Sequence, residues 1–106
     1  MRHFTPKQLK EYLESAETKP LLLDVREPWE YEICHIANSQ LIPMGHIPQQ
    51  MNTLDKSVEI VVICHHGIRS RQVGYYMAHY EFTNIINLDG GIEAWALEVE
   101  PTMQRY

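Results

Sequence analysis

The chain has few cysteines and few basic residues, and both shortages restrict what it can do. Only Cys34 and Cys64 occur among 106 residues. Two cysteines do not form a disulfide framework, and in a reducing compartment a cysteine in a polar loop is more often catalytic or metal-binding than structural. Nine Lys and Arg residues against 14 Asp and Glu give a net charge of -5. Because no basic stripe is available to neutralise phosphates, we expect no nucleic-acid partner.

Long apolar runs are also missing. No stretch approaches the ~18 apolar residues of a membrane span, and the first ten residues, MRHFTPKQLK, lack the apolar segment of a signal peptide. We therefore expect a cytoplasmic protein with no membrane partner. The length suits one hydrophobic core, and the chain has no repeat, low-complexity tract or linker, so residues 1–106 are expected to form a single domain.

Strand and helix patterns alternate along the chain. Thr5 followed by Pro6 predicts the start of a helix of about ten residues. Apolar runs predict strands at residues 20–25, 39–43, 58–63 and 84–88, with 58–63 at the centre of the sheet. Helices are predicted at 27–34, 45–52, 70–80 and 90–95. Tyr75, Tyr76 and Tyr80 suit either the core or a contact surface, and the core is the favoured interpretation. This alternation is typical of the α/β class, with a parallel sheet covered on both faces.

The segment CHHGIRS, residues 64–70, directly follows the central strand. Ligands of open parallel sheets bind beyond the carboxyl ends of the strands. Gly67 allows a tight turn, the start of the next helix adds partial positive charge, and Arg69 adds a planar fork of donors. We therefore predict that Cys64 is a nucleophile, favoured as thiolate, in an anion-binding loop. A buried structural cysteine is the alternative, but it leaves the polar residues after Cys64 unexplained.

Three segments resemble signatures of the rhodanese-domain sulfurtransferases. CHHGIRS resembles the active-site loop C-x-x-G-x-R-S, and DVREPWEYEICHI, residues 24–36, resembles D-V-R-E-x-x-E-[FY]-x-x-G-H-I. NLDGGIEAW, residues 87–95, is similar to L-x-G-G-x-x-x-W. The matches occur in the family's order over most of the chain. The resemblance implies a rhodanese-like fold, a central parallel five-stranded sheet flanked by helices on both faces.

The resemblance also implies a chemistry, that of a thiosulfate sulfurtransferase. Cys64 would attack the outer sulfur of a donor such as thiosulfate, become a persulfide and pass the sulfur to cyanide or a thiol. No cofactor or metal is implied. The donor or acceptor in the cell could equally be a persulfide-carrying or thioredoxin-like protein.

The resemblance assigns roles to particular residues. Cys64 and Arg69 carry over as catalytic residues. The remaining loop residues would contact the substrate: His65, His66, Gly67, Ile68 and Ser70. Supporting roles fall to residues at two neighbouring strand ends: Asp24, Arg26, Asp89, Gly90 and Gly91. Exposure without a role is an equally good interpretation of either histidine, and Ser70 equally suits helix capping alone.

Two other function classes remain open. A rhodanese-fold module without turnover would bind or regulate, but such modules are recognised by loss of the cysteine, which is present here. Cysteine-dependent phosphatases and arsenate reductases are the other alternative. In the phosphatase relatives five residues separate cysteine and arginine, whereas four separate Cys64 from Arg69. The shorter loop favours sulfur over phosphate.

Cys34 departs from the family pattern, which has glycine at this position. Glycine there suggests a positive φ or a tight contact that cysteine tolerates poorly. A tolerated substitution is one interpretation. Another makes Cys34 a second thiol that accepts sulfur from Cys64 or resolves its oxidised form. A zinc site built from Cys34-His35 and Cys64-His65-His66 is a weaker alternative, because adjacent side chains diverge, and we expect no metal.

Overall fold

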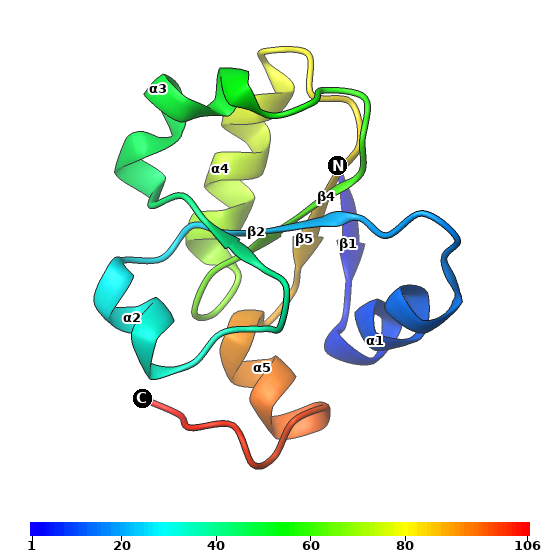
Figure 1. Ribbon diagram of the computed structural model, residues 1–106, viewed down its shortest axis with the longest axis vertical. Coiled ribbons are helices and arrows are strands. Elements are labelled where there is room, and N and C mark those ends of the chain that lie inside the picture. Colours follow the sequence, from blue (N-terminus) through cyan, green and yellow to red (C-terminus); the bar gives the residue numbers. More distant parts are fainter.

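The computed structural model describes all of residues 1–106, and Figure 1 shows how its elements are arranged. The chain alternates strands with helices throughout, in the order β1 (Arg2–Phe4), α1 (Pro6–Ser15), β2 (Leu21–Asp24), α2 (Pro28–Ile33), β3 (Gln40–Leu41), α3 (Ile47–Gln50), β4 (Ile60–Ile63), α4 (Ile68–Ala78), β5 (Ile85–Leu88) and α5 (Gly91–Glu98). Short 3-10 turns, η1 (Met44–His46) and η2 (Met51–Thr53), flank α3.

The five strands form one parallel sheet in the order β1-β5-β4-β2-β3. β4 is the middle strand, and its four residues are all buried. Because every strand runs in the same direction, the carboxyl ends of β2, β4 and β5 meet at one edge of the sheet. The predicted α/β class with a five-stranded parallel sheet is confirmed.

Two hydrophobic clusters cover the two faces of this sheet. Alternate residues of β4 point to opposite sides, so Val62 joins the cluster that contains side chains of α3 and α4, while Val61 joins the one that contains side chains of α1 and α5. Figure 1 shows the two helix pairs on their separate sides of the sheet. None of the helices has the length and apolar character needed to cross a membrane.

The first helix starts where its sequence predicts. Thr5 accepts a hydrogen bond from the backbone of Gln8, and the Gln8 side chain accepts one from the backbone of Thr5. This reciprocal capping box, with Pro6 in the first turn, satisfies two N–H groups that the helix itself leaves unpaired. The helix then runs for 10 residues, as predicted.

Several local predictions are wrong. The helix expected at 45–52 is divided into η1, α3 and η2, because the ring of Pro48 cannot follow a continuous helical turn. Helix α4 starts and ends two residues earlier than expected. The three-residue strand β1 pairs with β5 and was not indicated by any apolar run. Tyr75, Tyr76 and Tyr80 are exposed rather than in the core.

Candidate active site

Cys64 lies at the carboxyl end of β4, and the loop after it folds back on its sulfur. Gly67 adopts a left-handed conformation with φ 94°, and its N–H donates to the Cys64 Sγ at 3.0 Å. Elsewhere in the loop, the backbone N–H groups of His65, His66, Ile68, Arg69 and Ser70 donate to no acceptor in the protein. The loop therefore has free donors, and its sulfur is buried, since Cys64 is only 1% exposed.

A buried polar network supports this loop from β5. The Cys64 Sγ lies 3.3 Å from the Ser70 Oγ, which is 2.5 Å from the Asn87 Oδ1. The Asn87 Nδ2 donates to the Gly67 carbonyl oxygen at 3.3 Å and to the Asp89 Oδ1 at 2.8 Å. The network fixes the loop at three places and connects Asp89, a predicted supporting residue, to the thiol.

The loop also packs closely on the start of α5. Gly91 has φ 61°, and a Cβ there would overlap the carbonyl oxygens of both Cys64 and His65. The Ile92 N–H donates to the Cys64 carbonyl at 2.9 Å, and the Glu93 N–H donates to the His65 carbonyl at 3.1 Å. Glycine is therefore required at position 91 by conformation and by space. Gly90, at φ 77°, is the left-handed residue that begins the helix.

Arg69 directs its guanidinium to Glu30 of α2. The Nη1 and Nη2 donors bind the two carboxylate oxygens at 2.8 and 2.9 Å, a bidentate pair. Hydrogen bonding to Arg69 lowers the pKa of Glu30 to about 2, against the effect of burial, and hydrogen bonding to Glu30 raises the pKa of Arg69. In this structure both terminal nitrogens of Arg69 therefore bind protein, and its cation stays beside the loop in a fixed orientation.

Glu30 belongs to a larger buried network at the carboxyl edge of the sheet. The Tyr106 hydroxyl donates to the Glu30 Oε2 at 2.6 Å and accepts from the Arg26 Nη1 at 2.9 Å. Burial, and then the bond to Glu30, raises the pKa of Tyr106 to about 12. Arg26 is fully buried and pairs with Asp24 at 2.7 Å.

This network changes the role expected of Asp24 and Arg26. The sequence predicts a supporting role for both residues, but neither makes a hydrogen bond to the 64–70 loop. Arg26 instead donates to the Cys34 carbonyl at 2.7 Å and reaches the loop through Tyr106, Glu30 and Arg69. The physical reason is direction, since the β2 end turns these side chains toward α2 and the end of the chain.

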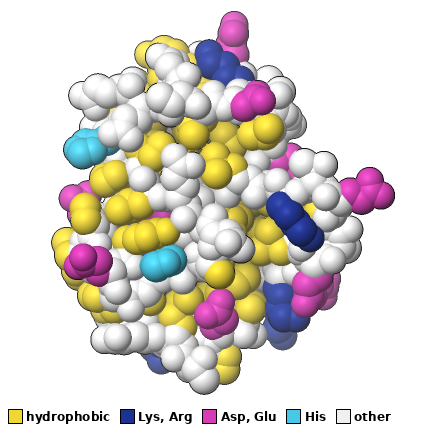
Figure 2. Space-filling model, viewed as in Figure 1, with side chains coloured by type: hydrophobic (Ala, Val, Ile, Leu, Met, Phe, Trp, Pro, Cys, Tyr) yellow, Lys and Arg dark blue, Asp and Glu magenta, His cyan; other side chains and the backbone are white.

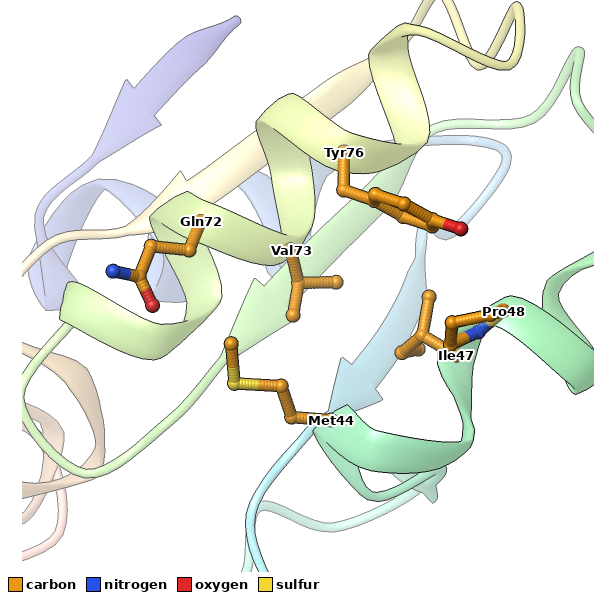
Figure 3. Close-up of a pocket in the computed structure, with 6 residues that line it drawn as sticks. All are labelled: Met44, Ile47, Pro48, Gln72, Val73 and Tyr76. Carbon is orange, nitrogen blue, oxygen red and sulfur yellow. The ribbon is translucent and has the colours of Figure 1, made fainter.

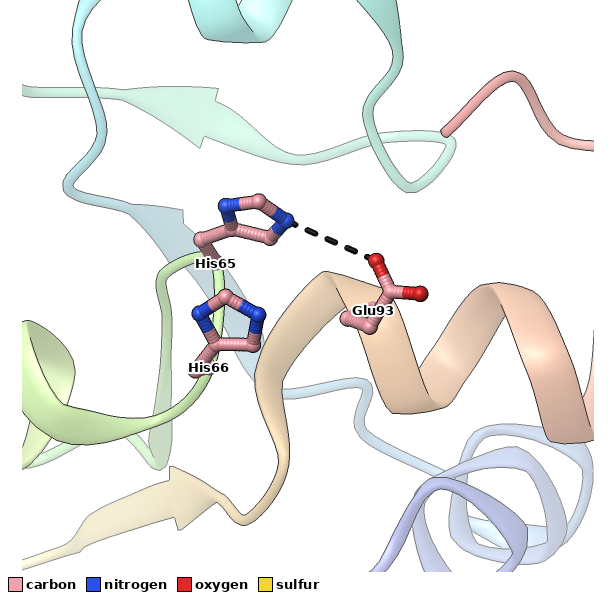
Figure 4. Close-up of side chains that lie close together, drawn as sticks. All are labelled: His65, His66 and Glu93. Carbon is pink, nitrogen blue, oxygen red and sulfur yellow. Dashed lines mark ion pairs between the residues drawn. The ribbon is translucent and has the colours of Figure 1, made fainter. Parts of the chain in front are cut away.

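His65 turns toward α5 and is stacked between His66 and Tyr106, with ring centroids 4.0 Å from each. Its Nε2 lies 3.5 Å from the Glu93 Oε2, the contact marked by the dashed line in Figure 4, and this nitrogen forms no hydrogen bond. Burial and then His66 lower the pKa of His65, against the opposing effect of Glu93. His65 is therefore a neutral imidazole at neutral pH.

His65, His66 and Glu93 place three potential metal ligands within 4.8 Å of one another. The two imidazole rings, however, stack at an interplanar angle of 18°, so their ring nitrogens run side by side rather than converge. Arg105 already binds the Glu93 Oε1 at 2.7 Å and neutralises its charge. The cluster is a stacked, charge-balanced contact between the loop and α5.

Cys34 does not have the geometry expected of it. Its φ of -163° and ψ of 151° are those of extended backbone, which any residue adopts, so no glycine is required there. Its side chain packs in the cluster under α1 and α5, whereas Cys64 packs in the cluster on the other face. Cys34 and His65 line one small pocket beside α5, but neither cysteine belongs to a cluster of potential metal ligands, and His35 stacks on Tyr31.

Helix α4 borders an apolar groove on the side away from α5. Met44, Ile47 and Pro48 line one wall, and Gln72, Val73 and Tyr76 of α4 line the other, around about 310 Å³ (Figure 3). Hydrophobic side chains are visible over the upper centre of this view of the molecule, with charged side chains mostly toward the margins (Figure 2).

Ile68, a predicted substrate contact, is 58% exposed at the start of α4.

Three residues of the site were missed in the sequence. Glu30 is the second glutamate of the stretch that resembles DVRExxE and lies inside that motif, whereas Asn87 directly precedes the LDGG segment. The sequence does not reveal the hydrogen-bond partner of either residue, because Glu30 is 39 residues from Arg69 and Asn87 is 17 residues from Ser70. Tyr106 lies outside all three motifs and carried no signal.

Known proteins resemble this chain in sequence and in structure. Residues 5–98 match the family described as Rhodanese-like domain. The Bacillus subtilis protein named "Putative sulfurtransferase YtwF" is 42% identical over 88% of this chain and 88% of its own length. Thiosulfate sulfurtransferase GlpE of Pseudomonas fluorescens is 32% identical over 74% of this chain and 72% of its own.

Longer proteins contain a similar segment, and a solved structure has the same fold. "Probable adenylyltransferase/sulfurtransferase MoeZ" of Mycobacterium tuberculosis is 36% identical over 96% of this chain, which spans only 26% of that protein. The crystal structure of a rhodanese-related protein from Thermoplasma volcanium superposes with a TM-score of 0.84 at 32% identity, covering 95% of this chain and 96% of that one. These relatives support a sulfur-transfer role in general. The chain belongs to the rhodanese-like domain family.

Proposed function

We propose that the protein is a sulfurtransferase that carries sulfane sulfur on Cys64. The Cys64 thiolate attacks the outer sulfur of thiosulfate, a new S–S bond forms, and sulfite leaves with the electron pair of the bond that breaks. The persulfide then reacts with a thiolate or cyanide, which takes the outer sulfur and releases the Cys64 thiolate. The protein itself needs no redox cofactor for either step.

The environment of the Cys64 sulfur carries this proposal. The Gly67 N–H already donates to the Sγ at 3.0 Å, and five further loop N–H groups have no protein acceptor. These donors stand at the start of α4, where the helix adds partial positive charge. An anionic donor and the outer sulfur of a persulfide both need such donors, whereas a structural cysteine needs none.

The choice of thiosulfate as donor rests on charge and on one relative. Thiosulfate is a small dianion that suits a loop of free N–H groups beside Arg69, and GlpE, 32% identical, bears the name thiosulfate sulfurtransferase. We propose a thiol or a persulfide-carrying protein as the partner in the cell. A relative at 38% identity is named "Putative sulfur carrier protein YrkF", which is consistent with a protein partner.

The test is the intact mass of the protein after incubation with thiosulfate. The variants Cys64→Ser and Cys34→Ser are treated in parallel, and each contains a single cysteine. We expect one added sulfur atom in the wild type and in Cys34→Ser, none in Cys64→Ser, and its removal by cyanide or dithiothreitol. Gain of sulfur by Cys64→Ser would transfer the role to Cys34. No gain in any protein, with thiosulfate or with a glutathione persulfide donor, would refute the proposed chemistry.

A further inference from the structure

The Ser70 hydroxyl lies between the thiol and a buried amide, and it has one proton to share between them. Its Oγ is 3.3 Å from the Cys64 Sγ and 2.5 Å from the Asn87 Oδ1. A serine hydroxyl donates one hydrogen bond and accepts two. Ser70 can therefore donate to the sulfur or to the amide, but not to both at once.

The orientation of Asn87 decides where this proton lies. The Asn87 Nδ2 donates to the Gly67 carbonyl and to the Asp89 carboxylate, at 3.3 and 2.8 Å. Both partners only accept hydrogen bonds, so a flipped amide would place oxygen against oxygen. The Oδ1 consequently faces Ser70, which is its one donor in the structure. Asn87 is 1% exposed, so water does not substitute for that donor.

This arrangement leaves Ser70 with only lone pairs for the sulfur. The protonated thiol fits these lone pairs, because its S–H can donate to the Ser70 Oγ while the Gly67 N–H donates to the Sγ. A thiolate has no proton to donate and would face a serine lone pair. For Ser70 to donate to the thiolate, its proton must leave the Asn87 Oδ1, and a buried acceptor is then left unpaired.

We propose that Asn87 is a positioning residue that holds the Ser70 proton away from the sulfur and so favours the protonated form of Cys64 at rest. When the thiol loses its proton to solvent, Ser70 turns its own proton from Asn87 to the sulfur. The network thus opposes the loop N–H groups, which favour the anion. The inference rests on the proposed function in taking Cys64 as the reactive thiol.

Other charged groups surround the loop and must stay constant in a test. Asp24 and Arg26 pair at the end of β2, Glu30 of α2 binds Arg69 of α4, and Glu93 of α5 binds Arg105. The remaining groups are Tyr106, which stacks on His65 and binds Glu30, His3 and Asp89, which contact each other beside β5, and the loop histidines His65 and His66. Neither Asn87→Leu nor Ser70→Ala changes the charge of these groups. Asn87→Leu removes the hydrogen bond to Asp89 in both backgrounds, so that effect cancels when its shifts in the two backgrounds are compared.

The experiment is a pH titration of the ultraviolet absorbance of the Cys64 thiolate, in a Cys34→Ser background. Each titration is corrected with the corresponding Cys64→Ser protein, which removes the tyrosine signal. The proteins are the background itself, Asn87→Leu, Ser70→Ala and the double variant. Asn84→Leu is the matched control, because the Asn84 amide binds the Ser57 carbonyl outside the loop.

We expect Asn87→Leu to lower the titration midpoint by about one pH unit, since the freed Ser70 proton can donate to the thiolate. This corresponds to about tenfold more thiolate below the midpoint, or about 1.4 kcal/mol. In the Ser70→Ala background the same substitution should shift the midpoint much less, so that the thiolate population below the midpoint changes by less than about threefold. Asn84→Leu should leave the midpoint unchanged.

Equal shifts in both backgrounds would show that Asn87 acts by some route other than the Ser70 proton, and would overturn the proposal. So would an unshifted or raised midpoint in folded Asn87→Leu protein. If Asn87→Leu does not fold, the infrared S–H stretching band of Cys64 decides. We expect Ser70→Ala to move that band toward the frequency of a free thiol, and an unmoved band would refute the inference. Neither measurement uses a sulfur donor, so failure of thiosulfate loading leaves both outcomes interpretable.

Discussion

Glu30 offers the sharpest quantitative test of the site's electrostatics. Its carboxylate is 4% exposed and accepts from both terminal nitrogens of Arg69 and from the Tyr106 hydroxyl. The pKa of Glu30 falls from 4.5 to about 2, with Arg69 as the first cause. At about 1.4 kcal/mol per pH unit, the folded protein favours the carboxylate over the acid by roughly 3 kcal/mol.

The sign of the pH dependence follows from the lowered pKa. This stability is fully present above pH 4.5 and is lost as the pH falls from 4.5 to about 2. In this range Glu30 is protonated in the unfolded chain but still ionised in the folded protein. Glu30→Gln keeps the shape of the side chain and removes its charge. We expect it to lower the free energy of unfolding by about 2–3 kcal/mol at pH 7 and by only about 1 kcal/mol at pH 3.

Urea unfolding followed by tryptophan fluorescence at both pH values measures this difference. The control is Glu14→Gln, which removes an exposed pair with Lys10 and should change the free energy of unfolding by less than about 0.5 kcal/mol at either pH. A Glu30→Gln effect below about 1 kcal/mol at pH 7 would contradict the reasoning. The same holds for an effect of equal size at pH 7 and pH 3, since a packing defect alone would not depend on the protonation of Glu30.

Three further outcomes follow from the structure. Gly91→Ala should lower the free energy of unfolding by at least about 2 kcal/mol, whereas Gly45→Ala, which meets open space, should be nearly neutral in the same urea assay; equal effects would show that the loop does not need its close approach to α5. The raised pKa of the Tyr106 hydroxyl stabilises the wild-type fold below pH 10, and this contribution is lost as the pH rises from 10 to about 12. Tyr106→Phe lacks the hydroxyl, so its free energy of unfolding should fall less over this pH range. Identical alkaline unfolding of the two proteins would argue against the buried hydroxyl network. The imidazole of His65 should titrate below pH 6.5 by NMR. As the pH falls below 6.5, the free energy of unfolding should decrease in the wild type, and it should decrease less steeply in His65→Asn. A midpoint above 6.5 would mean that the effect of Glu93 outweighs that of burial.

Features that depend on neighbouring residues were predictable from the sequence. Thr5 and Pro6 start a helix through bonds within one turn, and the apolar run of β4 marks the centre of the sheet. The order of strands and helices then determines the parallel class. The sequence predicts one helix over residues 45–52, but the ring of Pro48 interrupts the turn there.

The site was predictable in its thiol and loop but not in its partners. Cys64 and Gly67 lie together in the sequence, and Gly67 binds the sulfur across three residues. The binding of Arg69 by Glu30 joins residues 39 apart in the sequence, and the bond from Tyr106 to Glu30 joins residues 76 apart. No local pattern encodes such contacts. The sequence predicts Arg69 as a catalytic residue with a fork of donors for the anion-binding loop, whereas in the structure Glu30 binds this fork.

The packing of the two thiols in different clusters has a kinetic consequence. Cys64 and Cys34 belong to hydrophobic clusters on opposite faces of the sheet and form no disulfide, so we expect a sulfur on Cys64 not to move to Cys34 within the chain. A chain that carries sulfur on Cys64 therefore holds one atom at a time and releases it only in a collision with another molecule. Discharge should accordingly be second order, with a rate proportional to the concentration of the acceptor.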